Sequence, residues 1–571
     1  MVSTFYPTRT ALIGALAILL TASVQAQPII SATTPSSNKN GVPRSGAVAV
    51  RFNQPLTAGS TAALRVFSSQ RGGLRSGTSG AVYTANNELI FSPNFDFRPG
   101  EMVRVSVTTS AQSSSGALAT ARMFQFTAAA TGGNGVFSGG TEVSAGFNPY
   151  NVTMADVDND ADLDMVSPTF GGSSVSIRLN NGRGVFSSGS DPSVGSQPRS
   201  VTMADIDGDG DLDLLTANYN ANSASVRFNN GSGFFSGGAD YAAGSQPQSV
   251  TTADIDGDGD LDFLVANGAS NNVNLYFNSG SGIFNTGGTV AVGSFPFHIA
   301  TGDVDNDGDL DLLTANWGTS SYSVSVRLNN GNGTFSGGTD PVMDSQPRWL
   351  ALGDLDNDGD LDLLSANYGN NNASVRFNNG NGNFTGGTEL AAGNNPSSIV
   401  AADIDGDNDL DMLISNFYAN NVMVRLNNGN GTFGASSTLT VGTNPNGIAA
   451  ADVDGDGDLD LLAANFNSNT VSVRLNNGTA APLAIAATSA INAVAVYPNP
   501  AHSSFMVQVP GMATGTTATA TLLNSLGQRI RTNILLSASG TAVDMTGLAP
   551  GIYAMQIQIG NTLLMKPVVL E

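Results

Sequence analysis

The chain has 571 residues, contains no cysteine and carries a formal net charge of −24. The absence of cysteine excludes disulfide bonds, and the strong acidity argues against nucleic acid or an anionic membrane surface as a partner. The length is sufficient for several domains with cores of their own.

Residues 1–26 have the features of a secretory signal peptide. Arg9 precedes an apolar run from Ala11 to Leu20, and small residues lead to an exit at Ala26. The run is too short for a mature membrane helix, and no later run is long enough for one. We therefore expect an exported protein without a transmembrane segment in the mature chain.

Residues 28–129 are predicted to form a separate β-sandwich, because apolar residues alternate in short runs at 47–52, 89–91 and 102–107. The stretches VAVRFNQPL, from Val48, and LIFSPNFDFRPGEMVRVSV, from Leu89, resemble bacterial immunoglobulin-like (Ig-like) domains of extracellular proteins. The resemblance supports the fold and indicates little about a ligand.

An aspartate-rich segment then recurs seven times. The first aspartates are 49, 49, 49, 51, 49 and 49 residues apart and are Asp156, Asp205, Asp254, Asp303, Asp354, Asp403 and Asp452. Such a steady period indicates an array of one structural unit.

Each copy has aspartate at positions 1, 3, 5, 7 and 9, usually with glycine at position 6. Five carboxylates so close together need a counter-charge to stay ionised. The ligands available are oxygen atoms, and a flexible loop rich in oxygen suits Ca²⁺ better than octahedral Mg²⁺. The alternative is a solvated acidic turn that binds nothing, but seven copies in phase favour up to seven calcium sites.

The predicted metal residues are Asp156, Asp158, Asp160, Asp162 and Asp164; Asp205, Asp207, Asp209, Asp211 and Asp213; Asp254, Asp256, Asp258, Asp260 and Asp262; Asp303, Asp305, Asp307, Asp309 and Asp311; Asp354, Asp356, Asp358, Asp360 and Asp362; Asp403, Asp405, Asp407, Asp409 and Asp411; and Asp452, Asp454, Asp456, Asp458 and Asp460.

Residues 132–478 are predicted to form a seven-bladed β-propeller, because each repeat contains four short strand patterns joined as a meander. A linear stack would also fit the period but would leave two open sheet edges. The phase of the repeats favours a ring. A fourth-strand segment at 133–143 precedes the first loop, whereas the last repeat lacks its fourth strand, so the early segment is expected to complete blade seven.

These repeats resemble the FG-GAP/VCBS type, the calcium-loop propeller of integrin α-subunits and many bacterial surface proteins. The resemblance implies a loop between the first and second strands of each blade. It also implies ligation by the side chains at positions 1, 3, 5 and 9 and by the carbonyl at position 7. Ala161 and Asn408 replace the glycine at position 6, which puts the first and sixth sites in doubt.

After an Ala-, Thr- and Ser-rich linker at 479–492, residues 493–571 are predicted to form a small β-sandwich. The landmarks YPNP from Tyr497, LGQR from Leu526, LAPGIY from Leu548 and KPVVL from Lys566 resemble the C-terminal sorting domain of the type IX secretion system of Bacteroidetes. The resemblance implies passage across the outer membrane by that machinery, and release or surface attachment afterwards.

No catalytic constellation is evident in the sequence. The two histidines, His298 and His502, make a triad that uses histidine improbable. Acidic residues outside the loops are few and scattered: Glu142, Asp191, Asp240, Asp340, Asp344 and Glu389.

A ligand site is predicted on the propeller face opposite the aspartate loops, which receives the connections between second and third strands and between blades. The first set of connections supplies a recurring aromatic row, Phe170, Tyr219, Trp317, Tyr368, Phe417 and Phe466, near the asparagines Asn218, Asn316 and Asn367. Aromatic rings with amides suit sugars, but the row also fits packing between blades. The irregular second set is the sharper candidate and consists of Tyr150, Arg199, Phe297, Arg348 and Trp349. The predicted ligand-binding residues are these five and Trp317 of the aromatic row.

The sequence thus indicates an all-β, secreted or surface-attached, calcium-binding protein. We expect it to be a non-catalytic binding or adhesion module for a polysaccharide or surface glycoprotein. The alternatives are a polysaccharide lyase or glycoside hydrolase on a propeller scaffold, and a structural surface component.

Overall fold

The structure is a computed structural model that describes residues 27–71, 80–85, 87–318, 322–476, 495–497, 500–508, 518–523, 529–537, 540–559 and 562–570. The chain divides into two compact units, Met1–Gly478 and Thr479–Glu571. The predicted signal peptide and the predicted linker at 479–492 lie outside the described residues.

The first domain of unit one is a sandwich of two four-stranded sheets, as the alternating pattern predicts. Val50, Phe52, Phe91, Val105 and Phe124 from both sheets are buried in one core. One sheet contains, in order, β1 (Ile30–Thr34), β3 (Val48–Phe52), β6 (Glu88–Pro93) and β5 (Gly80–Ala85), and the other contains β2 (Lys39–Val42), β10 (Arg122–Ala128), β7 (Met102–Val107) and β4 (Leu64–Ser68). A 3-10 helix, Ala58–Ala63, and a hairpin of β8 (Gln112–Ser113) and β9 (Gly116–Ala117) complete it.

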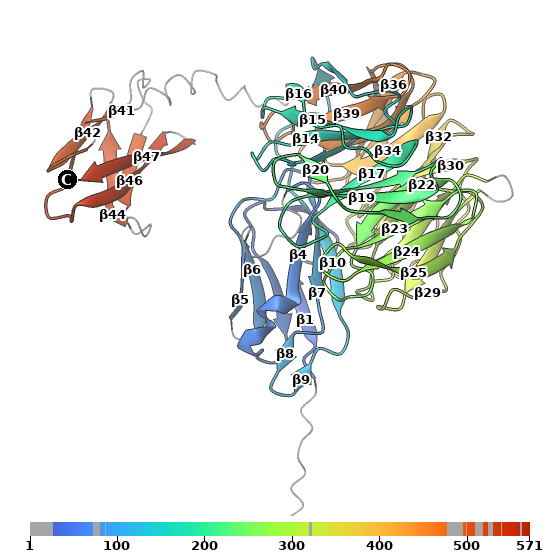
Figure 1. Cartoon of the computed structure of the whole chain (residues 1–571), viewed down its shortest axis with the longest axis horizontal. Coiled ribbons are helices and arrows are strands. Elements are labelled where there is room, and N and C mark those ends of the chain that lie inside the picture. Colours follow the sequence, from blue (N-terminus) through green and yellow to red (C-terminus); the bar gives the residue numbers. More distant parts are fainter. Residues whose placement is uncertain are drawn as a thin grey trace, which may run out of the picture. The chain divides into compact units, whose positions relative to one another are not determined.

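Between residues 137 and 476 the described chain forms seven antiparallel sheets, called here blades 1 to 7 (Figure 1). Blades 1 to 3 contain β13 (Thr153–Ala155), β14 (Asp164–Thr169), β15 (Ser174–Asn180) and β16 (Phe186–Ser188); β17 (Pro198–Ala204), β18 (Asp213–Asn218), β19 (Ser223–Asn229) and β20 (Phe235–Ser236), with β21 (Asp240–Ala242) also on β19; and β22 (Pro247–Ala253), β23 (Asp262–Asn267), β24 (Asn272–Asn278) and β25 (Phe284–Ala291).

Blades 4 to 7 contain β26 (Pro296–Gly302), β27 (Asp311–Asn316), β28 (Ser323–Asn329) and β29 (Phe335–Ser336); β30 (Pro347–Gly353), β31 (Asp362–Asn367), β32 (Asn372–Arg376) and β33 (Glu389–Ala391); β34 (Pro396–Ala402), β35 (Asp411–Asn416), β36 (Asn421–Asn427) and β37 (Phe433–Thr440); and β38 (Pro445–Ala451), β39 (Asp460–Asn465) and β40 (Thr470–Asn476), to which β11 (Phe137–Ser138) and β12 (Glu142–Ser144) are added.

The ring closes as the phase of the repeats predicts. β11 and β12, which precede blade 1 in the chain, pair antiparallel with β40 of blade 7. The first strands of neighbouring blades contact one another from β13 round to β38, and β38 contacts β13. The early segment therefore covers the edge that β40 would otherwise expose.

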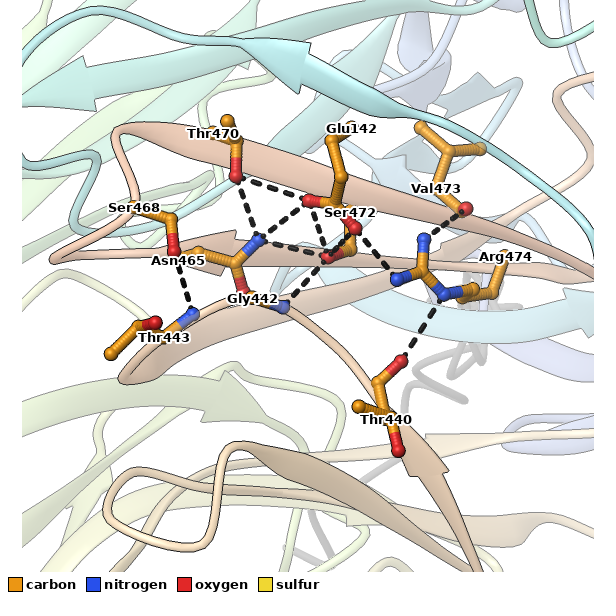
Figure 2. Close-up of polar contacts among 10 residues, drawn as sticks. All are labelled: Glu142, Thr440, Gly442, Thr443, Asn465, Ser468, Thr470, Ser472, Val473 and Arg474. Atoms are coloured by element: carbon orange, nitrogen blue, oxygen red, sulfur yellow. Dashed lines mark hydrogen bonds and ion pairs between the residues drawn. The ribbon is translucent and has the colours of Figure 1, made fainter.

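The closing strand is held by a polar network around the Glu142 carboxylate (Figure 2). It accepts hydrogen bonds from Ser472 Oγ at 2.8 Å, Thr470 Oγ1 at 3.1 Å and Asn465 Nδ2 at 3.3 Å. It also forms an ion pair with Arg474 Nη2 at 2.6 Å. One side chain of the early segment thereby ties β12 to two strands of the last repeat.

Apolar side chains between the blades form the core of the ring. In one such cluster, Val166 and Ile177 of blade 1 pack with Met203 and Leu214 of blade 2. The second strands are buried on both faces along their whole length, as in β18, Asp-Leu-Leu-Thr-Ala-Asn. These strands therefore sit between two neighbouring sheets, which explains their continuous rather than alternating apolar pattern.

Unit two is a small all-β domain. One sheet contains β41 (Ala495–Tyr497), β42 (Ser504–Gln508) and β45 (Thr541–Asp544), and a second contains β44 (Arg529–Leu536), β43 (Ala518–Leu523), β46 (Gly551–Ile559) and β47 (Thr562–Leu570). Phe505, Leu522, Met555 and Val568 are buried in its core.

Candidate metal loops and ligand face

Each aspartate loop joins the first and second strands of its blade, as the resemblance implies. Loops 1 to 7 are named by blade, and loop 2 runs from Asp205, after β17, to Asp213, which begins β18. The position-9 aspartate is therefore fixed by the sheet, whereas positions 1 to 8 lie on the connection.

Two loop positions have left-handed backbone. Position 6 has a φ of 96° at Gly210, 77° at Ala161 and 72° at Asn408. Glycine adopts this region without the steric cost that a Cβ imposes. Position 4 is also left-handed, as at Gly208 and Asn159. The left-handed backbone at position 4 was not predicted, although the restriction of this position to glycine or asparagine in all seven copies is a signal for it.

The left-handed turns aim backbone N–H groups at the position-1 carboxylate. In loop 2, Asp205 accepts hydrogen bonds from Gly208 N at 2.8 Å and from Gly210 N at 3.0 Å. Where asparagine occupies position 4, the first of these bonds is missing. The Oδ1 atoms concerned are buried and accept no hydrogen bond from the described residues; they belong to Asp156, Asp303 and Asp354.

Positions 1, 3 and 9 converge. In loop 2, one oxygen each of Asp205, Asp207 and Asp213 lies within 4.8 Å of the others; loops 1, 3, 4 and 5 have the same group, and two further acidic groups meet the same criterion. The position-9 carboxylate is itself anchored. Asp213 accepts from Ile206 N at 3.1 Å and from Asn229 N at 2.8 Å.

Burial leaves these carboxylates short of counter-charge. Burial raises the pKa of Asp164 to about 7, of Asp213 to about 8 and of Asp262 to about 9. Two backbone N–H donors lower each pKa, but the effect of burial is larger. Neighbouring aspartates raise the pKa values further. A bound cation would relieve both effects, because it stabilises the ionised carboxylates.

The donor set fits a hard divalent cation. All groups that converge are carboxylate oxygens. Several loops also contain buried oxygens that accept no hydrogen bond from the residues that the structure describes, including Oδ1 of the position-3 residues Asp356, Asp405 and Asp454. Calcium prefers such oxygen-rich, flexible sites. The position-5 carboxylate is half engaged, since Asp209 accepts from Asp211 N at 2.9 Å.

The position-7 carboxylates face away from the centre of the loop. A Cβ at Gly231, in the Asn-Asn-Gly turn of blade 2, would lie 2.6 Å from Asp211 Oδ2, so this turn requires glycine. Asp211 also accepts from Asn159 Nδ2, the position-4 side chain of loop 1, at 2.8 Å. The same bridge between neighbouring loops joins Asn306 to Asp360 and Asn357 to Asp409.

The six acidic residues of the propeller outside the loops are not scattered in space. Five of the six form ion pairs with an arginine of the third strand of their own blade: Arg178–Asp191, Arg227–Asp240, Arg327–Asp340, Arg376–Glu389 and Arg474–Glu142. The sixth, Asp344, accepts from Asn372 Nδ2 at 2.5 Å. In the first four pairs the acid follows the arginine by 13 residues, and this recurring spacing is a sequence signal for the ion pairs.

The recurring aromatic row forms a collar around the ring axis, on the face opposite the aspartate loops. Consecutive ring centroids lie 5.0 to 6.5 Å apart from Trp317 through Tyr368, Phe417, Phe466 and Phe170 to Tyr219. All six side chains are half-buried. The predicted amide partners Asn218, Asn316 and Asn367 are fully buried and donate to serine or asparagine side chains within their blades, so the expectation that they face a ligand is wrong.

A second ring lies at the start of the first strands. It consists of the residue after each initial proline, namely Tyr150, Arg199, Gln248, Phe297, Arg348, Ser397 and Asn446. Of the predicted ligand-binding residues, Tyr150, Phe297 and Arg348 are each only 7% exposed. Arg348 Nη2 donates to Asn446 Oδ1 at 2.5 Å and to Tyr150 Oη at 3.3 Å.

The two arginines of this ring lie against the aromatic rings. The Arg199 guanidinium is 3.8 Å from the Tyr219 centroid, and that of Arg348 is 5.0 Å from the Tyr368 centroid. The Nε atoms of both arginines have no partner among the described residues. This places two cations and six aromatic rings at one mouth of the ring.

Trp349 lies deeper, in a cavity of about 230 Å³ along the axis. Its ring stacks on His298 at 4.0 Å. Burial lowers the pKa of His298 to about 3, so the imidazole is neutral at physiological pH. The structure therefore separates Trp349 from Trp317, which belongs to the collar.

Comparison with known families supports the three-part organisation. A model of the FG-GAP-like repeat matches residues 168–216, 207–265, 255–314, 315–365, 354–414 and 409–463, which together cover more than half of the chain. A bacterial Ig-like domain matches residues 24–128, and a secretion system C-terminal sorting domain matches residues 495–571. The sorting domain indicates secretion or surface attachment. No helix among the described residues could cross a membrane.

Several solved structures are similar to this chain at low sequence identity. A lectin from Agrocybe aegerita that recognises non-reducing terminal N-acetylglucosamine is 22% identical, with a TM-score of 0.38 over 51% of this chain and 80% of the lectin. A candidate 6-phosphogluconolactonase from Bacteroides uniformis is 14% identical, with a TM-score of 0.43 over 53% of this chain and 88% of that protein. No curated protein sequence matches the chain.

Proposed function

The chain belongs to the FG-GAP-like repeat family, and on that premise we propose that it is a secreted or surface-attached, calcium-stabilised propeller that binds a polysaccharide or a surface glycoprotein without catalysis. The aspartate loops would hold calcium through positions 1, 3 and 9, with position 5 and the carbonyl of position 7 completing the sites. Calcium would supply counter-charge and order the loops.

The observation that carries the binding role is the aromatic collar. Half-buried rings arranged around one mouth offer faces on which sugars stack, and guanidinium groups beside them donate hydrogen bonds to hydroxyl or carboxylate oxygens. Trp317 and Tyr368 would supply stacking area, and Arg199, the more exposed arginine, would supply hydrogen bonds. Tyr150, Phe297 and Arg348 would support the collar from below.

The non-catalytic assignment follows from the engagement of the acids. Glycoside hydrolysis uses two carboxyl groups flanking one bond. Outside the loops, the carboxylates of this propeller are held by strand arginines or, at Asp344, by asparagine amides. A polysaccharide lyase or hydrolase remains the alternative that the following experiment distinguishes.

A glycan array probed with the mature protein in calcium tests the proposal. We expect retention of specific glycans, loss of that retention in Trp317→Ala and Tyr368→Ala, and no new reducing ends or unsaturated sugars. Phe234→Ala is the matched control, because Phe234 is an aromatic residue that is 58% exposed and lies on the Asn-Asn-Gly turns of the opposite face. Product release would favour the lyase or hydrolase alternative. Glycan retention that the collar variants leave unchanged would exclude the collar as the glycan-binding site.

A further inference from the structure

The Ig-like domain is the basic part of an acidic chain. Residues 28–129 contain nine Lys and Arg and three Asp and Glu, whereas the seven loops alone contain 35 aspartates. Opposite charge on two surfaces favours their association and fixes its orientation. In this structure the basic domain lies on the loop face of the propeller.

The position-6 carbonyl oxygens of four loops accept hydrogen bonds from this domain or the segment that follows it. The donors are Asn38 Nδ2 to Gly359 O at 3.0 Å, Met123 N to Gly308 O at 2.6 Å, Thr131 N to Gly457 O at 3.0 Å and Arg98 to Ala161 O. The left-handed turn at position 6 presents these oxygens outward. The domain therefore contacts the position-6 carbonyl oxygens, whose direction depends on the folded conformation of the loop backbone.

Other contacts reach position 1. Asn40 Nδ2 donates to Asp354 O at 2.9 Å, and Asp156 N donates to Gln70 O at 2.8 Å. Arg98 Nη2 lies 3.7 Å from Asp156 Oδ2. The interface thus includes residues of the metal loops themselves and not only their surroundings.

Arg104 of β7 closes the axial channel on this side. Its guanidinium donates to Thr252 O at 2.6 Å and to Thr301 Oγ1 at 3.1 Å, on the first strands of blades 3 and 4. Met102 and Gln125 of the same sheet line the axial cavity together with Trp349. A buried guanidinium that donates hydrogen bonds to another domain is costly to leave unpaired.

Calcium and the Ig-like domain require the same loop conformation. Five aspartates without a cation repel one another, and an expanded loop would withdraw the position-6 carbonyl from its donor. A loop with one Ca²⁺ keeps a net charge of −3, so the basic domain still faces negative charge. Two ligands that bind one conformation stabilise each other, and this coupling is reciprocal.

We propose that the Ig-like domain closes the axial cavity of the propeller in a calcium-dependent manner. It is docked on the loop face while the loops hold calcium, and it is released when they lose calcium. The inference rests on the proposed calcium binding. Its partner is the chain's own basic domain, and its consequence is that calcium controls solvent access to the axial cavity.

The fluorescence of Trp349 reports whether the Ig-like domain is docked. The chain has two tryptophans, so Trp317→Phe leaves Trp349 as the only one. In the full-length variant, acrylamide should quench Trp349 weakly with calcium and several-fold more strongly after chelation, and calcium should restore the protection. Calorimetry on the same samples measures calcium binding independently.

Reciprocity gives a second test. Arg104→Met removes the channel contact and should weaken the apparent calcium affinity about five- to tenfold, within the usual range of coupling between sites. Arg51→Met is the matched control. Arg51 lies in the same domain, but its side chain is 61% exposed and pairs with Glu88 at 2.6 Å. Asn38→Ala, at the loop 5 contact, provides a second interface variant if Arg104→Met folds poorly.

The outcomes separate the two proposals. If the protein binds calcium but calcium leaves the quenching of Trp349 unchanged or makes it stronger, calcium-dependent docking is wrong. The proposed calcium sites would not be affected by that result. Equal calcium affinity in Arg104→Met, Asn38→Ala and Arg51→Met would overturn calcium-dependent docking as well. Absence of calcium binding would overturn both.

Discussion

Glu142 and Arg474 are 332 positions apart in the chain, yet their side chains form an ion pair at 2.6 Å (Figure 2). In blades 1, 2, 4 and 5, an arginine of the third strand pairs with an acid that follows it in the same repeat, as in Arg178–Asp191 at 2.9 Å. In blade 7 the acid of this pair is Glu142, which comes from β12, the segment before blade 1. The closing contact is therefore the standard contact of a blade, made across the two ends of the array.

Glu142→Ala should destabilise the propeller more than Asp191→Ala. Both changes remove one partially exposed ion pair, which contributes about 0–1 kcal/mol. Glu142 additionally accepts from Ser472, Thr470 and Asn465, and its loss removes the side-chain contacts that tie β12 to the last repeat. We expect a lower melting temperature and a broader calorimetric transition for Glu142→Ala than for Asp191→Ala. Identical transitions would mean that backbone pairing alone closes the ring.

The seven-bladed ring could be predicted from the sequence because its determinants are local and repeated. The 49-residue period sets the unit, the flanking apolar runs set its strands, and the segment at 133–143 reveals the missing strand. Glycine at position 6 is a sequence signal for left-handed backbone, and the φ values of 96° at Gly210 and 77° at Ala161 agree with it.

Contacts between repeats could not be predicted in the same way. Whether Tyr150 and Arg348 face solvent or fill the axis depends on the radius of the ring, to which all seven first strands contribute. The docking of Arg104 into the channel has no local signal, because the residue stands in an ordinary alternating strand. Sequence periodicity defines each unit, whereas the closed assembly determines what the units enclose.

Chelation of calcium should lower the melting temperature of the propeller. Ions that bind only the folded loops stabilise them by about RT ln(1 + [L]/Kd) for each site. Differential scanning calorimetry of the mature protein with calcium and with a chelator measures the change, and magnesium at the same concentration serves as the control. An unchanged transition would identify the loops as solvated turns.

The metal-free protein should lose stability as pH rises. Burial raises the folded pKa of Asp213 to about 8 and of Asp411 to about 8, above about 3.9 in an unfolded chain. Above pH 4 the unfolded state therefore ionises first, and the penalty grows until the pH passes the folded pKa.

Calcium needs the ionised carboxylates, so its stabilising effect should increase over the same range. Melting temperatures measured between pH 5 and pH 9 with calcium and with chelator should diverge as pH rises. Parallel curves would contradict the burial of unpaired carboxylates in the metal-free loops.

Loop 1 should be the weakest calcium site, for two separable reasons. Ala161 adopts a φ of 77°, which costs a residue with a Cβ roughly 1–2 kcal/mol compared with glycine. The Arg98 guanidinium, 3.7 Å from Asp156, also places a cation beside the site and opposes a second one. Ala161→Gly should tighten the weakest class of sites in a calcium titration, by about tenfold for each 1.4 kcal/mol recovered. Gly210→Ala should weaken loop 2 by the same mechanism. Arg98→Met tests the charge of Arg98 and also removes its hydrogen bond to Ala161 O, so Asn38→Ala, which removes a docking contact without a change of charge, is its control. If Ala161→Gly and Gly210→Ala both leave the titration unchanged while Arg98→Met tightens it, the charge of Arg98 and not the backbone at position 6 ranks the loops.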